Sequence, residues 1–375
     1  MKVLISCGGT GGHINPGLAI ADIIKAKYPD AEFLFAGTPK GMESRLVPQA
    51  GYKMETIKVA GFQRSLSLEN IGRNIKAVTY LATSGKRAKE IIVNFKPDIA
   101  IGTGGYAAGP VIRKAAKMGI PTAIHEQNAY PGVTNRLLSK EVDYVMLTVK
   151  EALDFMDESK FEYSVTGLPV RSGISRISKS EARKKLGFNN DFTILSFGGS
   201  LGAGCINETM TEAIKWHFGK KLNINHIHGY GGMGKESFPK AMKEAGIPLK
   251  NNKLRITEYI SDMDVCLAAA DLVICRSGAS TLAELEAAGK ASILIPSPIV
   301  AGNHQYYNAM VLGKAGAAEV IEQKDALPEK IISEIEKLYN SPEKVEIMSM
   351  CAAGLHLTDT NERILAVVEK LLKIR

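Results

Sequence analysis

Short apolar runs rich in β-branched residues alternate with segments of helical periodicity along almost the whole chain. The apolar runs contain few polar residues, which is typical of strands in a parallel sheet with helices on both faces. They predict strands at residues 3–6, 32–36, 99–101, 122–125, 144–147, 193–197, 224–228, 272–275 and 292–295. The segments between them predict helices at residues 17–28, 207–216, 281–288 and 306–314. This alternation predicts an α/β fold built from doubly wound parallel sheets.

The middle of the chain has the features of a domain boundary. One alternating series ends at residues 166–171, which include Gly167 and Pro169, and a basic helical segment at 180–186 leads into the second series. A length of 375 residues suits two domains of ordinary size. We therefore expect domains at residues 1–167 and 168–354, facing each other across a cleft. An amphipathic helix is expected within the last segment, 355–375.

Composition and charge narrow the class of protein. Hydrophobic residues make up 45% of the chain and charged residues 23%, which excludes a disordered, collagenous or disulfide-scaffold protein. The five cysteines include no C-x-x-C pair, so we expect reduced thiols, no zinc site and a cytosolic location. The net charge of +8 permits an anionic partner, but one tryptophan and 6% aromatic residues argue against nucleic acid. Neither a signal peptide nor a membrane-spanning stretch is predicted.

Four glycine-rich turns follow predicted strands. In an open α/β sheet such turns gather at the carboxyl edge, where ligands bind. Glycine lets the backbone approach a phosphate, and the next helix offers free N–H groups and the positive end of its dipole. The alternative, that the glycines merely form tight turns, explains one such turn more easily than four. The turns lie at residues 8–13, 102–106, 198–203 and 276–281.

Two common nucleotide-binding motifs are missing from the sequence. The first turn does not fit G-x-G-x-x-G, because Ile14 stands where the third glycine would be, and no acidic residue ends the second predicted strand. No G-x-x-x-x-G-K-[ST] occurs either. We therefore expect no nicotinamide or ATP chemistry and no cofactor.

Six segments, taken in order and spacing, resemble the MurG family of N-acetylglucosaminyltransferases. They are Gly8–His13 with Pro16, Gly104–Tyr106, His125–Asn128, Pro169–Arg171, Gly198–Ser200 and Gln305–Ala309. The resemblance implies transfer of N-acetylglucosamine from UDP-N-acetylglucosamine to lipid I, which forms lipid II for peptidoglycan synthesis. It also implies the glycosyltransferase-B fold, with two Rossmann-like domains and a last helix that returns to the N-terminal domain. The N-terminal domain would bind the acceptor and the C-terminal domain the UDP-sugar.

The resemblance also implies a set of substrate-binding residues. Thr10, Gly11 and Gly12 would approach the diphosphate and the transferred sugar. The backbone of Ile260 would meet the uracil, Glu284 the ribose hydroxyls and Gln305 the sugar, while neighbouring His304 has no assigned role. Asn128, Arg171 and Ser200 would bind the donor. The remaining positions that the resemblance implies for substrate are Tyr106, Ala279, Ser280, Thr281, Leu282 and Ala283.

An inverting transfer needs a base for the acceptor hydroxyl and stabilisation for the departing diphosphate. No D-x-D motif is followed by a plausible set of metal ligands, so we expect no metal and assign the second task to helix N-termini. His13 is the first candidate base, because the positive end of a helix favours the neutral ring. Glu126, after a buried strand, is the second candidate.

Each of these assignments has a plainer alternative. His13 could cap or orient the first helix, and Glu126 could shape the acceptor pocket through hydrogen bonds. Glu284 could simply offset a helix dipole, Arg171 could cap the linker, and Tyr106 could belong to the core.

Residues 61–96 contain seven basic and two acidic side chains, and apolar residues recur near Arg73 and Lys76 at helical spacing. The plainer interpretation is an amphipathic helix packed on the sheet with a solvated basic face. The resemblance instead implies docking on the anionic inner face of the cell membrane, near possible cell-wall synthesis proteins. Two rival functions stay open, a UDP-N-acetylglucosamine 2-epimerase and a non-catalytic UDP-sugar sensor.

Overall fold

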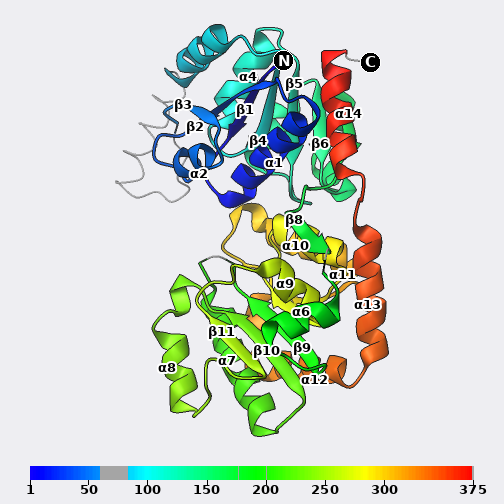
Figure 1. The fold of residues 1–375 in the computed structure, drawn as a ribbon. Helices are drawn as coiled ribbons and strands as arrows, with labels where there is room; N and C mark the ends of the chain where they lie inside the picture. Colours follow the sequence, from blue (N-terminus) through cyan, green and yellow to red (C-terminus); the bar gives the residue numbers. More distant parts are fainter. Residues whose placement is uncertain (60–82, 176, 200, 374–375) are drawn as a thin grey trace. The chain divides into compact units, whose positions relative to one another are not determined.

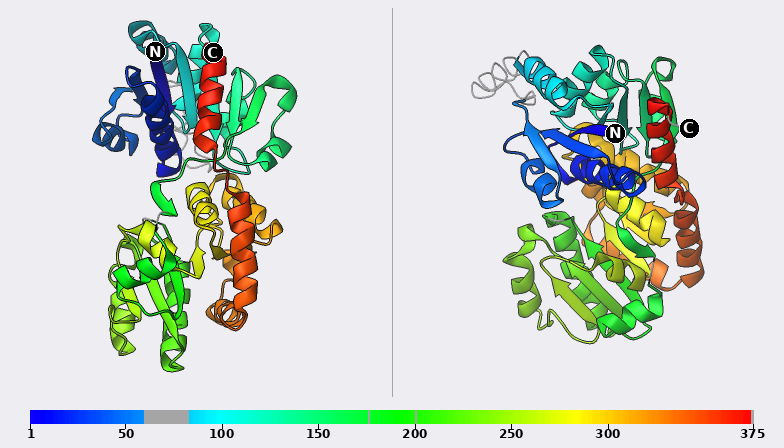
Figure 2. Two further views of the ribbon diagram at one scale, coloured as in Figure 1. Left: turned by 45° about the vertical axis from the view of Figure 1, so that its right-hand side comes forward. Right: turned by 45° about the horizontal axis from the view of Figure 1, so that its top comes forward.

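The computed structural model describes residues 1–59, 83–175, 177–199 and 201–373, and it divides the chain into two compact units. Unit 1 comprises Met1–Pro169 and Asp359–Arg375, and unit 2 comprises Val170–Thr358. Each unit is a parallel sheet with helices on both faces (Figures 1 and 2). The predicted α/β class with two doubly wound sheets is confirmed.

Unit 1 contains a seven-stranded sheet in the order β3-β2-β1-β4-β5-β6-β7, in which every neighbouring pair is parallel. The order reverses between β1 and β4, so the turns that follow these two strands lie side by side at the carboxyl edge. Residues 83–95 are also helical. The elements are β1 (Lys2–Cys7), α1 (Gly11–Lys27), β2 (Glu32–Gly37), α2 (Glu43–Gln49), β3 (Lys53–Thr56), β4 (Ile99–Gly104), α4 (Ala108–Lys117), β5 (Thr122–Glu126), α5 (Val133–Leu138), β6 (Tyr144–Leu147), the 3₁₀ turns Lys150–Phe155 and Glu158–Lys160, β7 (Glu162–Val165) and α14 (Thr360–Leu372).

Unit 2 contains a six-stranded parallel sheet in the order β11-β10-β9-β12-β13-β14, with its reversal between β9 and β12. The elements are β8 (Ser172–Ser175), α6 (Lys179–Leu186), β9 (Phe192–Phe197), α7 (Gly204–Gly219), β10 (Ile224–Gly229), α8 (Ser237–Glu244), β11 (Leu254–Thr257), α9 (Met263–Ala269), β12 (Leu272–Cys275), α10 (Ala279–Ala288), β13 (Ala291–Leu294), α11 (His304–Lys314), β14 (Ala318–Val320), α12 (Pro328–Tyr339), α13 (Pro342–Leu355) and the 3₁₀ turns Gly232–Gly234, Ala301–Asn303 and Gln323–Asp325.

Alternate residues of each central strand enter opposite core layers, as strand geometry requires. In β1, Val3 and Ile5 pack with α1 and α14, whereas Leu4 packs on the other face with α4. In β9, Ile194 packs with α7 and Leu195 packs with α9 and α10. Burial on both faces explains why these strands are largely apolar and could be predicted.

The last helix, α14, packs against α1 in unit 1, as Figure 1 shows. Its Ile364, Val367 and Val368 are buried in the same core layer as α1. Glu369 on its surface accepts hydrogen bonds from the Tyr28 hydroxyl at 2.8 Å and pairs with Lys27 at 2.6 Å. The expected return of the C-terminal helix to the N-terminal domain is confirmed.

The first helix differs from its prediction. It was expected at residues 17–28 but begins at Gly11, and Pro16 lies inside it. Glycines and a proline are typical of a turn, which is why the pattern placed the start too late. The earlier start puts Gly11 and Gly12 in the first helical turn, where backbone N–H groups have no partner within the helix.

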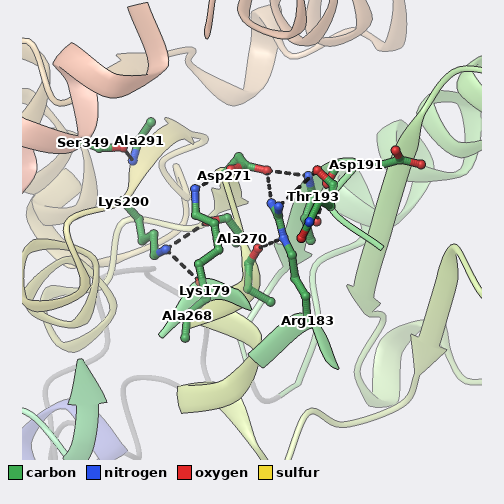
Figure 3. Close-up of polar contacts among 12 residues, drawn as sticks. Lys179, Arg183, Asp191, Thr193, Ala268, Ala270, Asp271, Lys290, Ala291 and Ser349 are labelled. Carbon is green, nitrogen blue, oxygen red and sulfur yellow. Dashed lines mark hydrogen bonds and ion pairs between the residues drawn. The ribbon is translucent and has the colours of Figure 1, made fainter. Parts of the chain in front are cut away.

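The amino edge of the unit 2 sheet is held by a charged network (Figure 3). The Asp271 carboxylate accepts from Arg183 Nη2 at 2.5 Å, from Lys179 Nζ at 2.6 Å and from the Thr193 backbone N–H at 2.7 Å. Buried Lys290 donates to the carbonyls of Ala268 and Ala270 at the end of α9, and burial lowers the pKa of this lysine to about 8. These bonds join α6, the end of α9, the start of β9 and the residue before β12, at the edge opposite to the glycine turns.

Three histidines form a buried chain in unit 2. His217 Nε2 lies 3.2 Å from His226 Nδ1, and the Ser196 hydroxyl lies 2.8 Å from both His226 Nε2 and His228 Nδ1. Burial lowers the pKa of His217 to about 4 and that of His228 to about 3, and it lowers the pKa of His226 well below its usual value. The folded chain therefore keeps these rings neutral at pH values where the unfolded chain protonates them.

This difference makes unit 2 sensitive to acid. Below pH 6.5 the unfolded state binds more protons than the folded state, so the free energy of unfolding falls as the pH drops. Replacing His217 with Gln removes one such group, and we expect the loss of stability between pH 6 and 4.5 to become smaller by about 1 kcal/mol per pH unit. Urea unfolding followed by Trp216 fluorescence, the signal of the single tryptophan, measures it. Exposed Asn223, replaced with Gln, removes no titratable group; it is the control and should leave the pH dependence as in the wild type. An unchanged dependence in His217→Gln would contradict the assignment.

Candidate active site

The turns after β1 and β4 approach each other very closely in unit 1. A methyl group placed on Gly105 would lie 2.1 Å from the Gly8 carbonyl oxygen, and one placed on Gly104 would lie 2.7 Å from His13 Nδ1. Gly104 and Gly105 also have positive φ angles of 101° and 84°, which side chains disfavour. The two glycines thus allow the turns to pack and leave room for the His13 ring.

Thr10, Gly11, Gly12 and His13 form the start of α1. Thr10 is the N-cap residue in an extended conformation, and its carbonyl accepts from the His13 N–H at 3.0 Å. The Thr103 hydroxyl donates to the His13 carbonyl at 2.7 Å, which fixes the backbone of the histidine. Exposed Thr10 and Gly12 and the N–H groups of this first turn suit an anionic or sugar ligand.

Glu126 ends β5 and is 1% exposed. Its Oε1 accepts from the Asn128 backbone N–H at 2.9 Å and from Asn128 Nδ2 at 3.0 Å. Its Oε2 accepts from the Gly132 N–H at 3.0 Å and from Asn135 Nδ2 at 2.8 Å. Four donors therefore surround this carboxylate and join β5, the following loop and α5, which suits the structural alternative better than a base.

Glu43 is a site residue that the sequence patterns did not indicate. It is fully buried at the start of α2 and accepts from the N–H groups of Gly9 at 3.1 Å and Thr38 at 2.8 Å. Burial alone would raise the pKa of Glu43, but the hydrogen bonds from Thr38 and Gly9 outweigh it and hold the pKa below its ordinary value. An ionised Glu43 thus holds the first glycine turn through the hydrogen bond that it accepts from the Gly9 N–H.

Tyr106 follows the second glycine turn and is 60% exposed. The alternative that it belongs to the core is therefore wrong. Its exposed ring, next to the turn that packs on Gly8, is available to a ligand.

In unit 2 the turns after β9 and β10 also pack backbone against backbone. A methyl group on Gly202, which has a φ of 83°, would lie 2.3 Å from the Tyr230 carbonyl oxygen. Ser200, predicted to bind the donor in the same turn, lies outside the described residues. Ile260 is 5% exposed with its side chain in the core, which leaves only its backbone for the predicted contact with uracil.

Arg171 and Glu284, both predicted for the donor site, contact each other. Arg171 Nε donates to Glu284 Oε1 at 2.6 Å, and Nη2 donates to Oε2 at 2.9 Å. This two-pronged pair orients the carboxylate in the second turn of α10, and each oxygen keeps a second lone pair for a further donor such as a hydroxyl. The pair does not use Nη1 of Arg171.

The residues at the start of α10 divide into two groups. Ala279, Ser280 and Thr281 are partly exposed in the first turn after the N-cap Gly278, whereas Leu282 and Ala283 are 5% exposed and pack in the core. The first group offers backbone N–H groups and hydroxyls to a diphosphate, and the second can contribute through backbone atoms alone.

Gln305 is joined to the same turn from α11. Its carbonyl accepts from the Ser277 hydroxyl at 2.8 Å, and its side-chain Oε1 accepts from the Ser297 N–H at 2.9 Å. The side-chain amide nitrogen of Gln305 is the group left for a sugar hydroxyl. His304 Nδ1 lies 2.9 Å from the Ala301 carbonyl, an orienting contact within its own loop.

Arg276 is a second residue that the patterns did not single out. It follows β12 in the turn to α10, and its guanidinium donates to the carbonyls of Ile295 and Pro296 and to Gln323 Oε1. These partners are neutral, so the cation adds positive potential to a turn suited to anions. Among the described residues, no three His, Cys, Asp or Glu side chains are grouped so as to hold a metal ion.

Two doubly wound sheets, each with glycine turns and helix N-termini at its carboxyl edge, place the chain in the glycosyltransferase-B fold class. The N-terminal domain model of glycosyltransferase family 28 matches residues 3–147, and the C-terminal domain model matches residues 193–364. The chain belongs to this family, and within it to the MurG transferases.

Individual relatives agree with this placement. A UDP-N-acetylglucosamine–N-acetylmuramyl-(pentapeptide) pyrophosphoryl-undecaprenol N-acetylglucosamine transferase of Acetivibrio thermocellus is 46% identical over 100% of this chain and 99% of its own length. The crystal structure of Acinetobacter baumannii MurG is 28% identical, covers 98% of this chain and 99% of that one, and has a TM-score of 0.78. A UDP-N-acetylglucosamine 2-epimerase structure covers 100% of this chain and 97% of that one with a TM-score of 0.62, but at 14% identity it shares the fold alone.

Proposed function

We propose that this chain transfers N-acetylglucosamine from UDP-N-acetylglucosamine to lipid I with inversion at the anomeric carbon, and so forms lipid II for peptidoglycan. The observation that carries the proposal is the 46% identity, over the whole chain, to a transferase whose name states this donor and acceptor. The epimerase alternative has support at the level of the fold only.

Unit 2 supplies the donor site in this proposal. The Arg171–Glu284 pair presents an oriented carboxylate to the ribose hydroxyls, and the first turn of α10 together with Arg276 receives the diphosphate. Gln305 contributes its amide nitrogen to the sugar, and the backbone of Ile260 contributes to the uracil. The positive ends of helices stabilise the charge that develops on the departing UDP.

Unit 1 supplies the base. His13 fills this role better than Glu126, because the Glu126 carboxylate already accepts four hydrogen bonds that hold the loop after β5. Glu126 then acts as a positioning residue for Asn128 and the acceptor side of the site. The hydrogen bond from Thr103 holds the backbone of His13 in place. The lack of a side chain at Gly104 leaves room for its ring.

The direct test is transfer from labelled UDP-N-acetylglucosamine to a lipid I analogue, with and without EDTA. We expect lipid II formation that EDTA does not abolish, and a turnover at least about 10² lower in His13→Ala with donor affinity near normal. Formation of UDP-N-acetylmannosamine from the donor alone would favour the epimerase. Strict metal dependence would contradict the proposed stabilisation of the leaving group, and full turnover in His13→Ala would remove this base.

Replacing Glu284 with Ala should weaken the affinity for UDP-N-acetylglucosamine by about 10- to 100-fold, because hydrogen bonds to a charged group contribute about 1.5–3 kcal/mol. A ribose contact is made alike in the ground and transition states, so turnover at saturating donor should change little. Calorimetric titration with the donor measures the effect. Glu286→Ala is the control, since residues two apart do not share a helix face. Normal affinity with a large fall in turnover would contradict the role of Glu284.

We also propose that the chain works at the inner face of the membrane, where lipid I and other cell-wall synthesis proteins are found. No helix of the described residues is long and apolar enough to cross a bilayer. Arg73 and Lys76, the basic residues expected to dock, lie outside the described residues. In the described remainder of this basic segment Lys86 and Lys89 are exposed, as is Val93 at 49%, whereas Arg87 is paired with Glu55.

Docking of this kind predicts salt-sensitive binding to vesicles that contain anionic lipid and weak binding to neutral ones. Each basic residue near an anionic surface contributes about 1 kcal/mol, so Lys86→Glu with Lys89→Glu should weaken binding by at least about 30-fold. Transfer to a soluble acceptor should survive. Lys240→Glu with Lys243→Glu, the same charge change on exposed α8, is the control in a vesicle-sedimentation assay. Equal binding by wild type and the Lys86/Lys89 variant would place docking elsewhere.

A further inference from the structure

Gln127 joins the proposed base to a buried histidine. Its side chain is 3% exposed, between the end of β5 and α1, and Oε1 lies 3.1 Å from His13 Nδ1. Its Nε2 lies 2.8 Å from the His125 carbonyl oxygen and 3.1 Å from His125 Nδ1. His125 Nε2 in turn lies 2.9 Å from the Gly167 carbonyl oxygen. The chain therefore runs from His13 through Gln127 to His125 and Gly167.

A backbone carbonyl at one point of the chain fixes the orientation of the amide. The His125 carbonyl oxygen can only accept a hydrogen bond, so the Gln127 atom 2.8 Å away must be the nitrogen. The amide oxygen then faces His13 Nδ1. Because an amide oxygen also only accepts, His13 Nδ1 must carry the proton.

A second carbonyl supports the same assignment from the far end. The Gly167 carbonyl can only accept, so His125 Nε2 carries a proton, and the neutral ring then has an unprotonated Nδ1 that accepts from Gln127. Burial lowers the pKa of His125, against the opposing effects of the Gly167 hydrogen bond and the Glu126 charge, which keeps this ring neutral. Every donor in the chain thus meets an acceptor in one arrangement of protons.

We propose that Gln127 is a positioning residue that holds His13 in the tautomer with its proton on Nδ1, so that the lone pair of Nε2 can take the proton of the acceptor hydroxyl. The use of that lone pair in catalysis rests on the proposed function. The assignment of the tautomer itself does not. In serine hydrolases a buried carboxylate accepts the hydrogen bond from Nδ1–H of the catalytic histidine. Here the neutral amide of Gln127 accepts that bond and sets the same tautomer.

In the transfer step, His13 Nε2 takes the proton of the acceptor hydroxyl while that oxygen bonds to the anomeric carbon. The bond from this carbon to the diphosphate oxygen breaks, and its electron pair leaves with UDP. The imidazolium that forms carries protons on both nitrogens, and its Nδ1–H still donates to Gln127 Oε1. Water later takes the Nε2 proton, which restores the starting tautomer.

The tautomer can be read without any activity. In protein labelled with ¹⁵N-histidine at neutral pH, nitrogen–carbon correlation spectra distinguish a ring protonated on Nδ1 from one protonated on Nε2. Because the chain has seven histidines, the signals of His13 can be assigned as the set that disappears in His13→Gln. We expect the Nδ1–H form for His13 and the Nε2–H form for His125. A neutral His13 with its proton on Nε2 would overturn the proposal even if transfer activity is present.

Kinetics of two variants test the consequence. Gln127→Met keeps the volume but neither accepts nor donates strongly, and we expect kcat to fall about 10²-fold with donor affinity retained and the His13 tautomer no longer fixed. Gln127→Glu keeps an acceptor for His13 Nδ1 while losing the bonds to His125, so its kcat should stay within about 10-fold of wild type. A purely structural role predicts the reverse order, because Glu also places a carboxylate against the His125 carbonyl. Exposed Gln49→Met is the control. Wild-type kcat and tautomer in Gln127→Met would overturn the proposal.

Discussion

The close approach of two backbone turns at the carboxyl edge of the first sheet determines how the rest of unit 1 is arranged. The carbonyl of Gly8 lies so near Gly105 that no side chain fits between them, and Gly104 beside it leaves room for the His13 ring. This contact is possible because the strand order reverses between β1 and β4 and brings the two turns together. The start of α1, and with it the histidine, is then held by Thr103 at the end of β4.

Unit 2 contains a similar close contact between backbone turns, but the turns follow a different pair of strands. There the turn after β9 packs on the turn after β10, where the positive φ of Gly202 and its contact with the Tyr230 carbonyl require glycine. The network around Asp271 holds the opposite edge of this sheet. The charged network thus lies at the amino edge of the sheet, and the glycine turns lie at the carboxyl edge.

The sequence patterns predicted the strands at the centre of each sheet and missed those at the edges. β3, β7, β11 and β14 all lie at sheet edges, where one side of a strand is open and polar residues such as Glu55 and Glu162 interrupt the apolar run. The glycine turns could be predicted, because a backbone contact or a positive φ restricts the choice of residue at that position.

The sequence patterns could not predict which side chains contact each other in the candidate site, and the reason is physical. The Arg171–Glu284 pair joins residues 113 positions apart, and Glu43 reaches Gly9 across 34 positions. Such contacts depend on the path of the folded chain and not on local periodicity. The resemblance named several members of the set, Arg171 and Glu284 among them, but not their contact with each other, nor Glu43 or Gln127.

The hydrogen bonds at the described turns also favour a histidine over three carboxylates as the proposed base. Glu43 is held by Thr38 and Gly9, Glu126 by four donors, and Glu284 by both prongs of Arg171. The oxygens of each carboxylate already accept hydrogen bonds that hold its own turn or helix, and taking up a proton would disturb those contacts. The Gln127 contact has the opposite character, because it uses His13 Nδ1 and leaves Nε2 outside the chain of bonds. Because these carboxylates accept structural hydrogen bonds, the proposed base needs one atom for the contact that positions it and another atom for the proton. Imidazole provides two ring nitrogens that can serve these two purposes.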